Sequence, residues 1–131
     1  MPDKLANFKK LAPGLFKDLV EKYGYDLDQI KINQSDNRDW SVHIIYTNHD
    51  KNLRIVIKQE PYYTDYGFSF FIYKLGTKEY NILYNVEHHR QDSEDNFLLK
   101  AYDDLFHTKE TLDIITGHEW KELKRIPFKT G

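Results

Sequence analysis

Residues 40–58 read WSVHIIYTNHDKNLRIVIK. In residues 40–47, one side of the backbone carries Trp40, Val42, Ile44 and Tyr46. Alternation with a period of two is typical of a strand that buries one face. Residues 53–57 repeat the pattern after the short polar connection of residues 48–52. The stretch therefore predicts an antiparallel β-hairpin.

Two further strands are expected after this hairpin. Residues 67–74 (GFSFFIYK) and 79–86 (EYNILYNV) are joined by a short connection that contains Gly76, as in many hairpin loops. Residues 25–32 (YDLDQIKI) are another strand candidate, and the polar residues 35–39 are expected to form a turn. Because all these connections are short, they favour an antiparallel meander over parallel crossovers.

Helical patterns flank the strands on both sides. Residues 5–23 carry apolar side chains at helical spacing with lysines between them, which is typical of an amphipathic helix. Residues 13–14 (Pro-Gly) are expected to break that helix. Residues 97–106 and 108–116 show the same periodicity, and Gly117 suits the C-terminal cap of the second piece.

The order of these elements predicts an α+β fold. We expect an N-terminal helix, an antiparallel meander of four to five strands, and a C-terminal helix or helix pair packed on one sheet face. A chain of 131 residues fits a single domain spanning residues 1–131.

The composition excludes several kinds of chemistry. The chain has no cysteine, which excludes disulfides, thiolate metal sites and thiol nucleophiles. The net charge of -2 gives no strong field to steer a polyanion. No phosphate-cradling glycine loop, dinucleotide fingerprint or H-x-x-x-H or H-E-x-x-H metal spacing is present, so no cofactor, metal site or catalytic residue is expected. Without a signal peptide or a long apolar stretch, the sequence predicts a soluble cytoplasmic protein without membrane contact.

Residues 59–73 read QEPYYTDYGFSFFIY, and seven of these residues are aromatic. Residues 66–73 overlap the pattern of the central strand of the RNA-recognition motif, in which Phe68 and Phe70 would stack on bases. The element order differs from that fold and the basic residue of the pattern is missing, so nucleic acid is disfavoured as a ligand. The favoured interpretation is that Phe68, Phe70 and Ile72 face the helices as core.

The opposite face of the sheet would then carry Phe71 and Tyr73 together with Ile45, Val56 and Leu83. An antiparallel sheet usually exposes its second face to water. Because these side chains are apolar, we expect this face to be covered by the C-terminal tail, by a partner protein, or by a second copy of the chain in a homodimer.

Two clusters are candidate contacts for a protein partner. Tyrosine is enriched at interfaces, and carboxylates near a helix start would attract a basic partner. The candidate partner-binding residues are Tyr62, Tyr63, Tyr66, Glu87, Asp92, Glu94 and Asp95.

Asp113, Glu119 and Lys121 form a D-x5-E-x-K spacing. The spacing resembles the metal-binding core of restriction-type nucleases, in which carboxylates hold Mg²⁺. Those nucleases place the motif on strands, whereas Asp113 falls in an expected helix. A metal-dependent nuclease is therefore the least favoured hypothesis.

The layout as a whole resembles the small single-domain immunity proteins of bacterial toxin systems. It has a leading amphipathic helix that ends in KYG (residues 22–24), a W-x-V-x-I-x-Y strand (residues 40–46), a meander and an acidic closing helix. The resemblance implies a non-catalytic bacterial protein-interaction module that binds one toxin and blocks it. Single-stranded RNA binding through the strand aromatics is the first alternative.

Overall fold

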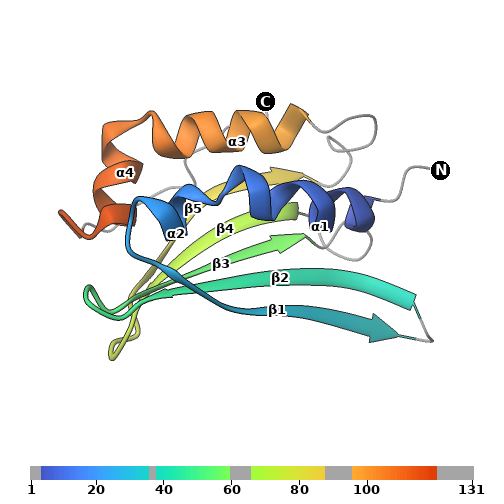
Figure 1. Cartoon of the computed structure of the whole chain (residues 1–131), viewed down its shortest axis with the longest axis horizontal. Coiled ribbons are helices and arrows are strands. Elements are labelled where there is room, and N and C mark those ends of the chain that lie inside the picture. The colour runs from blue at the N-terminus through green and yellow to red at the C-terminus, as the bar shows by residue number, and fades with distance from the viewer. Residues whose placement is uncertain (1–3, 36–37, 60–65, 88–95, 121–131) are drawn as a thin grey trace.

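The computed structural model describes residues 4–35, 38–59, 66–87 and 96–120. The elements are α1 (Lys4–Leu15), α2 (Asp18–Glu21), β1 (Asp26–Ser35), β2 (Arg38–Asn48), β3 (Leu53–Gln59), β4 (Tyr66–Lys74), β5 (Tyr80–Glu87), α3 (Asn96–Phe106) and α4 (Lys109–Thr116). The strands form one five-stranded antiparallel sheet in chain order, and the helices lie over one face of it (Figure 1). The expected α+β class, antiparallel meander and C-terminal helix pair are confirmed. Among the described helices, none has both the length and the apolar character needed to cross a membrane.

The sheet face that packs on the helices, here called the inner face, carries the side chains that the period of two predicts. Its buried members are Val42, Ile44 and Tyr46 of β2, Ile55 and Ile57 of β3, and Phe68, Phe70 and Ile72 of β4. Against them pack Phe8, Ala12, Phe16, Leu19, Leu98, Ala101, Leu105, Ile114 and Ile115 from the helices and their connections. Burial of one face of the sheet under the helices therefore accounts for most of the core.

A bulge in β5 changes which of its residues face the helices. Phe70 pairs with Tyr84 and Phe71 pairs with Ile82, so Leu83 has no partner on β4. Leu83 is fully buried and belongs to the core. The expectation that Leu83 lies on the opposite face is wrong, because the extra residue shifts the alternation and gives that place to Ile82.

Helix α1 continues beyond the expected break at residues 13–14. Pro13 lies inside α1, which ends at Leu15, and α2 begins at Asp18. Proline lacks an N–H and therefore removes one helical hydrogen bond, but its fixed φ is compatible with a helix. The turn that follows is still closed, because the backbone N–H of Phe16 donates to the carbonyl of Ala12 at 2.9 Å.

Two buried tyrosines connect the sheet side of the molecule to the C-terminal helices. The hydroxyl of Tyr25 donates to the carbonyl of Ile115 at 2.6 Å, and the hydroxyl of Tyr84 donates to Asp104 at 3.0 Å. Burial raises the pKa of Tyr25 and of Tyr84, the second also through its bond to Asp104, and raises the pKa of Tyr46 to about 12. All three hydroxyls are thus protonated in the fold.

These tyrosines predict that the fold loses stability in alkaline solution. An unfolded tyrosine ionises near pH ~10, whereas Tyr46 in the fold ionises near pH 12. Between these values the unfolded chain binds fewer protons than the folded chain, so the free energy of unfolding falls as pH rises. Each of Tyr25, Tyr46 and Tyr84 contributes up to about 1.4 kcal/mol per pH unit.

Denaturant unfolding followed by circular dichroism, at a series of pH values, measures this dependence. We expect a plateau below pH ~10 and a decline above it, with a shallower decline in the Tyr46→Phe variant. A free energy of unfolding that stays constant up to pH ~12 would contradict the burial of these hydroxyls.

Gln59 is a polar exception on the inner face. It pairs with Val42 and Phe68 in the sheet and is fully buried. Neither its Oε1 nor its Nε2 atom has a hydrogen-bond partner in the described part of the chain. An unpaired buried amide costs about 1–3 kcal/mol, so this side chain destabilises the fold.

Replacing Gln59 with methionine should therefore raise the free energy of unfolding by about 1–2 kcal/mol, because methionine fills a similar volume without the amide. Urea titration of both proteins measures the difference. The control is Gln29→Met at an exposed position of β1, where a change of less than about 0.5 kcal/mol is expected. A loss of stability in the Gln59→Met variant would show that the amide is paired.

Candidate functional site

The sheet face turned away from the helices, here called the outer face, carries a continuous apolar row. Ile45 of β2, Val56 of β3, Phe71 of β4 and Ile82 of β5 are paired side by side across four strands. Val56 is almost buried and the other three side chains are half-buried. We call these four residues the outer apolar row. The sheet therefore has a second hydrophobic surface that the helices do not use.

Two further aromatic rings extend this row from Phe71 towards the β4–β5 turn. The ring centroids of Phe71 and Tyr73 are 6.0 Å apart with planes 11° apart, and those of Tyr73 and Tyr80 are 5.7 Å apart. Phe71 and Tyr80 also stack at 6.2 Å. Tyr80 is 50% exposed, so this outer aromatic patch (Phe71, Tyr73 and Tyr80) presents one ring to solvent on a base of two others.

The hydroxyl of Tyr73 stays neutral well above physiological pH. Its burial, and secondly its proximity to Tyr80, raise the pKa of Tyr73. The patch therefore offers a hydrogen-bonding edge from Tyr73 without a negative charge, beside the apolar faces of the rings.

Two lysines and a histidine run along one side of the outer apolar row. Lys31, His43 and Lys58 are paired across β1, β2 and β3 on the outer face. The Nζ atom of Lys58 lies 4.4 Å from the ring centroid of Phe71, which is a cation–π contact. Neither Lys31 nor Lys58 forms a salt bridge within the described residues. We call Lys31, His43 and Lys58 the outer cationic row.

A polar network holds the other side of the outer apolar row in register. Asp28 is the extra residue of a bulge in β1, and its carboxylate accepts a hydrogen bond from Thr47 Oγ1 at 2.5 Å. Arg54 Nε donates to the same Thr47 hydroxyl at 3.2 Å, and Arg54 Nη2 lies 3.5 Å from Asp28 Oδ2. The charge of Arg54 is thus balanced within the sheet, whereas that of Lys58 is available to a partner.

The contact residues predicted from the sequence lie at one end of the sheet or outside the described residues. Tyr66 pairs with Glu87 across β4 and β5. The predicted tyrosine cluster therefore leads into the first residue of β4, and the predicted acidic cluster begins at the last residue of β5. These two strand ends are neighbours in the sheet. The others lie outside the described residues: Tyr62, Tyr63, Asp92, Glu94 and Asp95. Their role as partner contacts stays a prediction.

Phe68 and Phe70 are not available for stacking on a base. Both rings are fully buried on the inner face. Phe68 meets Phe8 of α1 at 6.2 Å, and Phe70 meets Phe16 at 5.9 Å. The aromatic strand pattern is therefore explained by core packing, and base stacking on these two rings is excluded.

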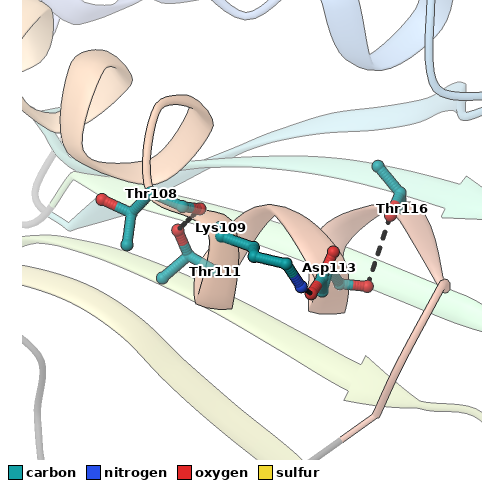
Figure 2. A network of polar contacts seen from close by, with 5 residues as sticks. All are labelled: Thr108, Lys109, Thr111, Asp113 and Thr116. Carbon is teal, nitrogen blue, oxygen red and sulfur yellow. Dashed lines mark hydrogen bonds and ion pairs between the residues drawn. The ribbon is translucent and has the colours of Figure 1, made fainter.

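In the nuclease-like spacing, the carboxylate of Asp113 is engaged within its own helix. Figure 2 shows Lys109, whose Nζ atom donates to Asp113 Oδ2 at 2.7 Å, and Thr116, whose hydroxyl donates to the Asp113 carbonyl at 3.3 Å. Asp113 lies on α4, and Lys121 is outside the described residues. No group of three or more histidine, aspartate or glutamate side chains that could hold a metal ion occurs in the described ranges.

The hydroxyl of Thr111 explains how α4 follows α3 so closely. It donates to the carbonyl of Thr108 at 3.1 Å, a bond that Figure 2 shows. It also lies 2.7 Å from the carbonyl of Leu105 in α3. Thr108 occupies the N-cap position without a capping bond from its side chain. The helix ends at Gly117, whose φ of 76° is left-handed as the sequence predicts for a glycine cap.

Sequence reasoning did not single out Tyr80 and Lys58. If Leu83 lay on the outer face, simple alternation would place Tyr80 on the inner face. The bulge at Leu83 reverses that assignment. The signal for Lys58 was present, because it follows the inner-face residue Ile57 in β3 and therefore falls on the outer face. The cation–π contact of Lys58 could not be predicted from β3 alone, because Phe71 belongs to another strand.

Comparison of the chain with known proteins identified no relative. No family model matches the chain, and neither the curated proteins nor the solved structures contain a match.

Proposed function

We propose that the chain is a non-catalytic protein-interaction module whose contact surface is the outer face of the sheet. The observation that carries the proposal is the outer apolar row, which continues into the outer aromatic patch and has His43, Lys58 and Arg54 at its sides. An apolar, aromatic centre with a polar rim is the usual anatomy of a protein interface. Tyrosine and arginine are also the residues that most often dominate binding energy.

The charges beside the patch suggest the chemistry of the partner. Lys58 and Lys31 have no carboxylate partner in the described part of the chain, whereas Arg54 is balanced by Asp28. A partner that places a carboxylate near Lys58 and an apolar side chain on Tyr80 would satisfy both features. Such charge complementarity mainly sets specificity and association rate.

The partner class that we propose is a toxin that the module binds and blocks. The order of elements supports this proposal: a leading helix, a meander of strands and closing helices, as in the immunity-type proteins that the sequence resembles. Single-stranded RNA is the second candidate, because a cationic row beside stacked rings also suits a nucleic-acid strand.

Parallel affinity capture from the host lysate distinguishes these candidates. The baits are the wild-type chain, the Tyr80→Ser/Lys58→Glu variant, and a matched Leu99→Ser/Lys100→Glu variant on the exposed side of α3. We expect one stoichiometric protein on the wild-type and α3 baits, and its loss from the outer-face bait. Retention of that protein by all three baits would contradict the outer face as the contact surface. RNA captured without a protein would favour the second candidate.

A further inference from the structure

The free edge of β1 is a second surface, separate from the outer face. β1 stands at one side of the sheet and, among the strands that the structure describes, pairs only with β2 (Figure 1). Every side chain from Asp26 to Ile32 is exposed. An edge strand offers unpaired backbone N–H and C=O groups, which can pair with another strand.

The helix side of this edge is apolar. Leu27, Ile30 and Ile32 are 47%, 44% and 43% exposed. They pair with Tyr46, Ile44 and Val42, which are buried inner-face residues. The three side chains of β1 are therefore inner-face positions that the helices leave uncovered.

The neighbouring helix α2 carries a further exposed apolar side chain. Val20 belongs to α2, the short helix that contacts β1, and it is 45% exposed. Four of the six large hydrophobic side chains that are exposed in the described residues thus belong to β1 and α2. Clustering of this kind indicates an interaction surface rather than isolated exposed residues.

We propose that this edge binds the same edge of a second copy of the chain. Two β1 strands related by a two-fold axis would run antiparallel and join the two sheets into one. This proposal does not rest on the function proposed for the outer face, although Lys31 belongs to both surfaces.

The bulge in β1 limits the registers that such a pair can adopt. Because Asp28 is an extra residue, the inner positions are Leu27, Ile30 and Ile32, and Asp26 and Lys31 lie on the outer face. Paired strands must match inner with inner and outer with outer positions. One register that does so opposes Leu27 to the second copy's Ile30 and Asp26 to the second copy's Lys31.

Charge distinguishes this register from another one that matches the faces. The alternative opposes Ile30 to the second copy's Ile32, and it places Lys31 opposite its own symmetry mate. Like charges directly opposite each other destabilise a strand pair, whereas opposite charges stabilise it. Asp26 and Lys31 have no salt-bridge partner among the described residues, so both are available for the first register, which forms two such pairs.

Cysteine cross-linking tests the register, because the chain has no cysteine of its own. An oxidised mixture of the Asp26→Cys and Lys31→Cys variants should give a mixed disulfide dimer in high yield. Each variant alone should stay uncrosslinked under the same conditions. A disulfide dimer from Lys31→Cys alone would overturn the proposed register.

Sedimentation equilibrium of charge variants tests the interface itself. We expect the wild-type chain to dimerise, and Lys31→Asp to raise the dimer Kd by at least about tenfold, since two attractive pairs become repulsive. The double variant Asp26→Lys/Lys31→Asp should restore the wild-type Kd, and Lys100→Asp on α3 should leave it unchanged. A wild-type chain that stays monomeric up to about 1 mM would overturn the proposal, as would a double variant no tighter than Lys31→Asp.

Discussion

Replacing Phe16 with alanine should lower the free energy of unfolding by about 4 kcal/mol. Phe16 is fully buried in the connection between α1 and α2. Its ring lies 5.9 Å from Phe70 of β4, 6.2 Å from Tyr102 and 6.2 Å from Phe106 of α3. The substitution removes the ring that joins the N-terminal helices, the sheet and α3, and neighbours from three directions cannot all move into the cavity.

Chemical denaturation of the purified variant measures this effect. Leu99→Ala is the control, because Leu99 is 57% exposed on α3 and should change the free energy of unfolding by less than about 0.5 kcal/mol. A Phe16→Ala variant that loses less than about 1 kcal/mol would mean that the cluster is not a shared core.

Replacing Tyr80 with alanine should weaken partner binding by about 30-fold or more, equivalent to at least ~2 kcal/mol. Tyr80 is the exposed ring of the outer aromatic patch, and it rests against Phe71 and Tyr73. A ring held in place by two others loses little conformational entropy on binding, which is characteristic of an interface anchor. Because Tyr80 is half-exposed, its removal should change folding stability much less than it changes affinity.

Isothermal titration with the captured partner measures this loss. Phe71→Ala is not a suitable companion, because Phe71 also packs within the sheet. Lys58→Gln is a more suitable second variant for the titration, since it removes a charge and leaves the ring contacts of the patch in place. An affinity for the Tyr80→Ala variant within a factor of about two of wild type would place the binding energy elsewhere.

The sequence was sufficient for the fold because the inner-face positions of β2, β3 and β4 recur with a period of two. Val42, Ile44 and Ile57 lie on the inner face as the period of two requires. The aromatic strand was assigned correctly for the same reason, since Phe68 and Phe70 share the inner face and Phe71 lies opposite. Alternation is a local property, so each strand could be read without knowledge of its neighbours.

The sequence was insufficient to predict side-chain positions that depend on a β-bulge or on the pairing of two strands. The bulge at Leu83 depends on how β5 hydrogen-bonds with β4, and no residue type within β5 encodes it. The proximity of Lys58 to Phe71 depends on the register of two strands. Helix α1 continues through Pro13 because the fixed φ of proline is compatible with a helix, so the residue type alone did not mark the helix end.

The measurement that tests the outer face most directly is hydroxyl-radical footprinting of the chain, free and bound to its captured partner. Oxidation of Tyr80 should fall several-fold in the complex, because its exposed ring would be covered. Oxidation of Leu99, which is exposed on α3, should stay unchanged. Full oxidation of Tyr80 in the complex, with protection of Leu99 or of the β1 side chains Leu27 and Ile30, would contradict the assignment of the outer face as the partner-binding surface.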